Sequence, residues 1–108
     1  MFIAIRPAEL AARLRAGEPT VLVDVRQPWE HELARLPGSV LLPLGELPAR
    51  AGEIVAPEDA LVVAYCHHGV RSQSGAAILL GHGLRHVASL VGGIEAWSAE
   101  VDPGIQRY

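Results

Sequence analysis

The sequence predicts an α/β fold of three layers, with a central, mainly parallel sheet of about five strands flanked by helices. Two observations lead to this prediction. Short apolar runs typical of strands alternate with helix-like stretches along the whole 108-residue chain. The runs at 21–25 and 61–65 are nearly continuous in aliphatic residues, which is typical of strands that are buried on both faces of a parallel sheet.

Each expected strand is a short, mostly apolar run; four of the five are followed by a charge, a glycine or a proline, and the run 61–65 is followed by Cys66. In chain order, we expect strands at 2–5, 21–25, 40–42, 61–65 and 86–91. The helices between them are marked by apolar residues at helical spacing, with Pro7 suited to a first helical position and Gly17 to a helix end. We expect helices at 7–17, 27–35 (a short helix or turn), 44–54 and 72–81, then one after Gly92-Gly93 that contains Trp97, and an irregular tail at 102–108.

The composition limits the classes of protein to which the chain can belong. Its length and its hydrophobic content of 50% fit a single globular domain, residues 1–108. The net charge of −3 and the absence of a basic run argue against nucleic acid or a membrane as a partner. The first residues are broken by Arg6 and Pro7, unlike a secretory signal. The single cysteine excludes an internal disulfide, so we expect a cytoplasmic protein.

Cys66 is the most informative residue. It follows the apolar run 60–65 and begins the loop 66–71 (Cys-His-His-Gly-Val-Arg), after which Ser72 opens a helical pattern. A strand that ends in a thiol and turns into a helix aims backbone N–H groups and the positive end of the helix dipole at the sulfur. Both favour the thiolate, the nucleophilic form. The sequence therefore predicts a reactive cysteine at the carboxyl edge of the sheet, where such folds bind ligands.

Other interpretations of this loop stay open. A lone cysteine is more commonly a small apolar residue of the core. Cys66, His67 and His68 could bind a soft metal, but adjacent side chains of one short loop rarely converge on one ion, so no metal is expected. The Cys-x4-Arg spacing is one residue shorter than the Cys-x5-Arg loop that holds phosphate in cysteine phosphatases. A phosphatase or arsenate reductase is therefore disfavoured.

Three segments, in this order, resemble the signatures of a known family. They are Asp24-Val25-Arg26 with Glu30, Pro37-Gly38-Ser39 and Leu42-Pro43; the loop 66–72; and 90–97, Leu-Val-Gly-Gly-Ile-Glu-Ala-Trp. Together they resemble a single-domain rhodanese, a member of the rhodanese-like sulfurtransferase family, over nearly the whole chain. Two positions depart from the pattern: Ala34-Arg35 replaces the usual Gly-His, and His31 replaces the aromatic residue that often follows Glu30.

The resemblance implies a two-step sulfur transfer through Cys66. Its thiolate would attack the outer sulfur of a donor such as thiosulfate, expel sulfite and become a persulfide. A nucleophilic acceptor, either cyanide or a small-molecule or protein thiol, would then remove the outer sulfur. No metal and no organic cofactor is implied. An alternative of another class is a non-catalytic sulfur-carrier or partner-binding module, in which the same loop holds sulfur but turns over poorly alone.

The resemblance also assigns roles to the residues around Cys66. The persulfide-binding loop would consist of His67, His68, Gly69, Val70 and Arg71, with Asp24, Arg26 and Ser72 as supporting residues.

Several of these roles have alternatives. Arg71 either binds a sulfonate or pins the loop through a salt bridge. For His67 and His68 we favour exposed side chains, so that the backbone of these residues, and not their side chains, acts on the sulfur. Asp24 and Arg26 fit a bracing ion pair or turn, together with Glu30, better than direct catalysis.

Three further residues receive simple structural expectations. We expect Gly69 to supply a backbone conformation that other residues avoid, and Ser72 to satisfy free N–H groups at a helix start. Trp29 either lines the pocket or caps the core, and the sequence does not separate the two.

Overall fold

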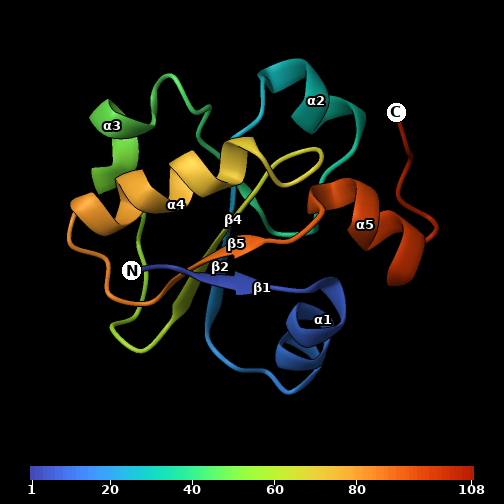
Figure 1. Cartoon of the computed structure of the whole chain (residues 1–108), viewed down its shortest axis with the longest axis horizontal. Helices are drawn as coiled ribbons and strands as arrows, with labels where there is room; N and C mark the ends of the chain where they lie inside the picture. Colours follow the sequence, from blue (N-terminus) through green and yellow to red (C-terminus); the bar gives the residue numbers. More distant parts are fainter.

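The computed structural model describes all residues from Met1 to Tyr108 and contains one sheet of five parallel strands (Figure 1). The strand order across the sheet is β1-β5-β4-β2-β3, and every pairing is parallel. The predicted fold class is therefore confirmed. The strands are β1 (Ile3–Ile5), β2 (Thr20–Asp24), β3 (Val40–Leu41), β4 (Leu61–Tyr65) and β5 (Val87–Leu90).

Helices cover both faces of this sheet, as Figure 1 shows: α1 and α5 lie on one face, and α3 and α4 on the other. The short helix α2 lies near the carboxyl ends of the strands, close to the tail of the chain. The helices are α1 (Pro7–Arg15), α2 (Pro28–Leu33), α3 (Leu47–Arg50), α4 (Arg71–Gly81) and α5 (Gly93–Glu100), with a 3-10 turn, η1 (Ala51–Glu53), after α3.

The helix expected at 44–54 is shorter than predicted. Residues 44–46 form a turn, and α3 begins only at Leu47. The end of the predicted helix is the 3-10 turn η1 instead of α-helix. The cause is Pro48, which lies in the first turn of α3. Proline lacks an N–H and clashes with a preceding helical turn, so the helix has to begin next to it. The other predicted elements differ from the structure only by a few residues at their ends.

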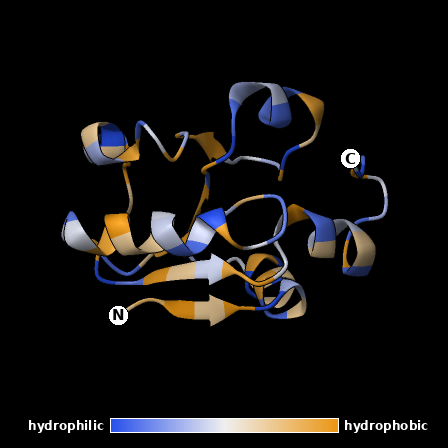
Figure 2. Cartoon of the chain, turned by 45° about the horizontal axis from the view of Figure 1, so that its top comes forward, coloured by the Kyte–Doolittle hydropathy of each residue, from blue (hydrophilic) through white to orange (hydrophobic).

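The core consists of two hydrophobic clusters, one on each face of the sheet. All five residues of β4 are buried, because this central strand is covered on both faces. Alternate β4 side chains go to opposite clusters: Val63 and Tyr65 belong to the α1–α5 face, and Val62 and Ala64 to the α3–α4 face. In Figure 2, most of the visible strand ribbon has the colours of hydrophobic residues. None of the helices has the length and apolarity to cross a membrane.

Candidate active site

Cys66 lies directly after β4, at the carboxyl edge of the sheet, and its sulfur accepts two backbone hydrogen bonds. The N–H groups of Gly69 and Ser72 donate to Sγ at 3.1 and 3.3 Å. Ser72 belongs to the first turn of α4, so one donor comes from the loop and the other from a helix N-terminus. The cysteine is 1% exposed and also contacts the apolar cluster of the α3–α4 face. The buried sulfur thus has oriented donors that can stabilise negative charge.

Two glycines allow the loop to approach α5 closely. Gly69 has a φ of 95°, and a Cβ there would lie 2.9 Å from the backbone nitrogen of Gly92. Gly93 has a φ of 60°, and a Cβ there would lie 2.4 Å from the carbonyl oxygen of Cys66. This fit lets Ile94 N–H donate to the Cys66 carbonyl oxygen at 2.9 Å. The expected special conformation of Gly69 is confirmed, and the Gly-Gly segment anchors the loop to the start of α5.

Arg71 and Glu30 form a two-pronged ion pair at the end of the loop. The Nη1 and Nη2 groups of Arg71 donate to Glu30 Oε1 and Oε2 at 2.7 and 2.9 Å. Glu30 also accepts the N–H of Gln27 at 3.0 Å, which caps the start of α2. The hydrogen bonds from Arg71 lower the pKa of Glu30 to about 2, against the opposing effect of burial. The same hydrogen bonds raise the pKa of Arg71. Both groups are therefore charged at neutral pH.

Asp24 and Arg26 form a second ion pair, deeper in the molecule, where β2 ends. Arg26 donates from Nε to Asp24 Oδ1 at 2.8 Å and from Nη2 to Oδ2 at 2.7 Å, and both side chains are fully buried. The same Nη2 donates to the carbonyl oxygen of Ala34 at 2.6 Å. Burial tends to lower the pKa of Arg26, but the hydrogen bonds to Asp24, the charge of Asp24 and the contact with Tyr108 together outweigh it, so the net shift is upward.

Tyr65 and His31 complete the surroundings of Asp24. The Tyr65 hydroxyl donates to Asp24 Oδ2 at 3.2 Å, and His31 Nδ1 lies 2.8 Å from the same oxygen. Burial, followed by the charge of Asp24, raises the pKa of Tyr65 to about 12, so it stays a donor. His31, which replaces an aromatic residue in the family pattern, therefore contacts the buried carboxylate.

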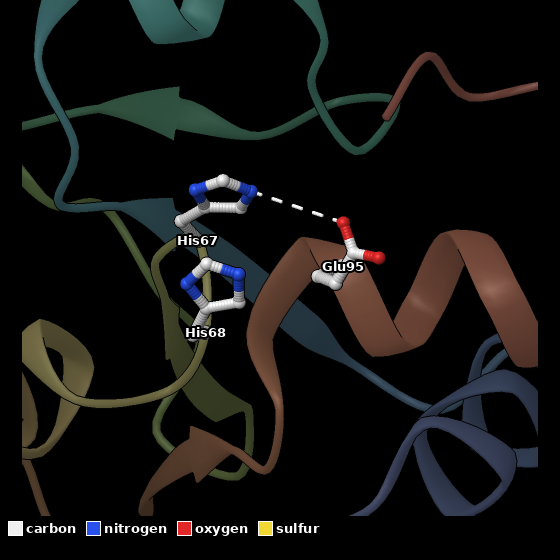
Figure 3. Close-up of side chains that lie close together, drawn as sticks. All are labelled: His67, His68 and Glu95. Atoms are coloured by element: carbon white, nitrogen blue, oxygen red, sulfur yellow. Dashed lines mark ion pairs between the residues drawn. The ribbon is translucent and has the colours of Figure 1, made fainter. Parts of the chain in front are cut away.

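His67 and His68 lie one against the other at the mouth of the loop. Their rings stack with centroids 3.9 Å apart, and Figure 3 shows both beside Glu95 of α5. His67 Nε2 is buried without a hydrogen-bond partner and lies 3.9 Å from Glu95 Oε1. Burial, and then the charge of His68, lowers the pKa of His67. The ligand atoms of these three residues lie within 4.8 Å of one another, but stacked rings direct their in-plane lone pairs side by side instead of toward one ion.

Tyr108 is the site residue that the sequence did not indicate. Its hydroxyl lies 2.6 Å from Arg26 Nη1 and 2.8 Å from Glu30 Oε2, and its ring stacks on His67. Burial raises the pKa of Tyr108 to about 12. A single aromatic residue in an irregular tail has no periodicity and no motif, so only the structure reveals these contacts. They join Tyr108 to both ion pairs.

Two expectations about neighbouring side chains are wrong. Ser72 was expected to satisfy free N–H groups at the helix start, but α4 has no side-chain cap, and the Ser72 hydroxyl is hydrogen-bonded to that of Ser89 at 2.7 Å. Both serines are buried, so their hydroxyls satisfy each other. The His67 side chain was expected to be exposed, but only 17% of it is, because its ring stacks with those of His68 and Tyr108. Of the two roles left open for Trp29, capping of the core is excluded, since Trp29 is 60% exposed and its ring meets the ring of Tyr108 edge-on.

A surface cavity of about 380 Å³ lies against the loop. Its lining includes His68, Gly69 and Val70 of the loop, and also Ser89 and Val91. Val70 is exposed at the tip of the loop. His68 and Val70 are thus accessible from outside, whereas Gly69 and the Cys66 side chain are buried.

The chain belongs to the family of rhodanese-like domains, whose model matches residues 6–100. It resembles in structure a rhodanese-related protein from Thermoplasma volcanium, with a TM-score of 0.82, 26% identity, and coverage of 99% of this chain and 100% of the other. The family resemblance noted in the sequence is therefore confirmed.

Curated relatives point to sulfur transfer at the family level. The chain is 42% identical to the thiosulfate sulfurtransferase GlpE of Pseudomonas syringae, over 84% of this chain and 83% of the relative. It is 34% identical to the probable adenylyltransferase/sulfurtransferase MoeZ of Mycobacterium tuberculosis, over 96% of this chain but only 26% of that protein. It is 31% identical to the putative sulfur carrier protein YrkF of Bacillus subtilis, over 83% and 48% of the two chains. The chain thus spans only part of the length of two of these relatives.

Proposed function

We propose that this protein is a sulfurtransferase that carries sulfane sulfur as a persulfide on Cys66. The observation that supports this most directly is the pair of N–H donors on Cys66 Sγ, from Gly69 and Ser72. Donors of this kind favour a negatively charged sulfur, which is needed both to attack a donor molecule and to hold the persulfide anion. The similarity to a thiosulfate sulfurtransferase over most of both chains points the same way.

The proposed reaction has two steps. The Cys66 thiolate attacks the outer sulfur of thiosulfate, so that a new S–S bond forms while the S–S bond of thiosulfate breaks and sulfite leaves with the electron pair. A cyanide ion or a thiolate then attacks the outer sulfur of the persulfide, and the Cys66 thiolate is released as leaving group. Sulfur is transferred with no external oxidant, metal or organic cofactor. The reducing cytoplasm, where the thiol stays free, is the proposed location.

In this mechanism we assign Arg71 a bracing role. Both of its terminal nitrogens donate to Glu30, so the guanidinium is already occupied and holds the end of the loop in place. The backbone of residues 67–71 would surround the outer sulfur, and Asp24 and Arg26 would support the loop from below. The physiological acceptor would be a low-pKa thiol, on a small molecule or on a partner protein.

Intact mass spectrometry tests the covalent step. After exposure to thiosulfate and removal of excess reagent, the wild-type protein should gain the mass of one sulfur atom, and a thiol reductant should remove it. Cys66→Ala should gain nothing, and Ser74→Ala, a change at a position with no assigned role, should behave as wild type. A wild-type protein that stays unmodified with thiosulfate and with other sulfane donors would refute the proposal.

A sulfur-carrier module is the second candidate, supported by the similarity to a putative sulfur carrier protein. Steady-state turnover with thiosulfate and cyanide separates the two. An enzyme should form thiocyanate over many cycles, whereas a carrier should load one sulfur per chain and then stop until a protein acceptor is added.

A further inference from the structure

We infer that Tyr108 is a positioning residue for the loop 66–71, because it holds the start and the end of that loop at the same time. Tyr108 lies in the tail that follows α5, outside the residues 6–100 that match the family model. The tail would therefore be part of the working site of this protein. The effect on catalysis rests on the proposed function, but the effect on Cys66 itself does not.

The hydroxyl of Tyr108 acts on the end of the loop through Glu30. It accepts a hydrogen bond from Arg26 Nη1 at 2.6 Å and donates one to Glu30 Oε2 at 2.8 Å. The direction of both bonds is fixed, because a guanidinium can only donate and a carboxylate can only accept. The other donors to Glu30 include both terminal nitrogens of Arg71, the last residue of the loop. A group at position 108 must donate and accept at once to keep this connection.

The ring of Tyr108 acts on the start of the loop. It stacks on His67 with centroids 3.9 Å apart and planes only 9° from parallel, and His67 in turn stacks on His68. His67 directly follows Cys66, so the stack covers the segment that leaves the nucleophile. Figure 3 shows the other neighbour of these rings, Glu95 of α5, which faces His67.

The tail is held in place by contacts of its own. The Ser98 hydroxyl donates to the carbonyl oxygen of Ile105 at 2.7 Å, and Ile105 packs against the core cluster of the α1–α5 face. Arg107 forms an ion pair with Glu95. Tyr108 is therefore presented to the loop by a segment that is fixed on both the core and the surface.

The consequence concerns the two amides that point at the sulfur. Gly69 lies within the loop and Ser72 directly follows its last residue, Arg71, so their N–H directions depend on how firmly the two ends of the loop are held. If Tyr108 positions the loop, loss of its hydroxyl should weaken the hydrogen bonds from Gly69 and Ser72 to Sγ, although no group that touches the sulfur has been removed.

The decisive measurement is the pH dependence of Cys66 alkylation by iodoacetamide in the intact protein, followed by mass spectrometry. In Tyr108→Phe, which keeps the stack but loses the hydroxyl, we expect the rate at neutral pH to fall about three- to tenfold and the midpoint to move to higher pH, since one net hydrogen bond is worth roughly a factor of ten. Tyr108→Leu, which loses the stack as well, should show a larger change. Gln106→Ala is the matched control in the same tail, because Gln106 is exposed, and its rate should stay within about twofold of wild type.

Amide hydrogen exchange provides a second measurement. In Tyr108→Phe, the amides of Gly69 and Ser72 should exchange faster, while that of Leu22 in strand β2, which pairs with the central strand β4, should not change. An unchanged pH profile in Tyr108→Phe, together with unchanged exchange at Gly69 and Ser72, would overturn the inference and leave Tyr108 with a purely structural role. Failure of the proposed function would appear differently, as an absence of sulfur uptake in wild type with the alkylation differences intact.

Discussion

The two arginine–carboxylate pairs beside Cys66 are chemically alike but lie in different surroundings. Asp24 and Arg26 are 0% exposed, whereas Arg71 is 36% exposed and its partner Glu30 5%. A fully buried pair cannot lose one partner without leaving an uncompensated charge in the interior. A pair at the surface can exchange its partner for water. The inner pair, Asp24–Arg26, thus maintains the fold, whereas the outer pair, Glu30–Arg71, can hold a loop.

The partners of each pair support this distinction. Arg26 donates to Asp24, to the carbonyl oxygen of Ala34 and to Tyr108, and none of these groups belongs to the loop 66–71. Glu30, in contrast, accepts from the loop residue Arg71 and from the helix start at Gln27. The Tyr108 hydroxyl is the direct link between the two pairs. Changes in the inner pair should therefore affect stability most, and changes in the outer pair should affect the loop.

The largest effect is expected from Arg26→Met. This change leaves Asp24 buried without its cation, and breaking a buried pair in this way costs about 3–5 kcal/mol. Urea denaturation should show this loss in the free energy of unfolding at pH 7. The double variant Asp24→Asn with Arg26→Met should recover part of it, because the unpaired charge is gone. A loss below about 1 kcal/mol in the single variant would contradict a structural role for the inner pair.

The next effect concerns the pH dependence of stability through Glu30. Its pKa is lowered to about 2 in the folded protein, from an ordinary value near 4.5. A lowered pKa of a carboxyl group stabilises the folded state above the unfolded pKa, and this contribution is lost as the pH falls toward the folded pKa. The shift corresponds to about 3 kcal/mol, present above about pH 5 and lost between about pH 5 and pH 2.

Glu30→Gln tests this linkage because glutamine can still accept from Gln27 but carries no charge. The variant should be less stable than wild type at pH 7, and the difference should shrink as the pH falls to 2. Urea denaturation at several pH values measures both curves. Parallel curves for the two proteins would show that Glu30 does not titrate with the expected shift.

The inner parts of the fold were predictable from the sequence, and the reason is burial. The run 61–65 coincides with β4, because a strand covered on both faces needs aliphatic residues throughout. The positive φ of Gly69 was predictable too, because a chain that turns tightly from a strand into a helix around a sulfur needs a backbone conformation that glycine adopts easily. Local chemistry determines these features, so a local pattern is enough to find them.

The contacts across the site could not be predicted in the same way. Tyr108 meets Arg26 and Glu30, which are 82 and 78 residues away in the chain, through a tail without regular structure. The bond between Ser72 and Ser89 likewise depends on how α4 crosses β5. Arg71 had two open roles in the sequence, because no pattern shows that Glu30 of α2 lies opposite the end of the loop.

The smallest effect on stability, and the sharpest test of the comparison, is expected from Arg71→Lys. Lysine keeps the charge but cannot donate two parallel hydrogen bonds to Glu30. Because this pair is partly exposed, the free energy of unfolding should fall by only about 0.5–1 kcal/mol, less than for Glu30→Gln at pH 7. The rate of sulfur uptake from thiosulfate should nevertheless fall about three- to tenfold, since the end of the loop is held by one bond where two held it before. Denaturation and time-resolved mass spectrometry on the same samples give both numbers. A variant that lost stability and sulfur uptake in equal proportion would show that the outer pair, like the inner one, only maintains the fold.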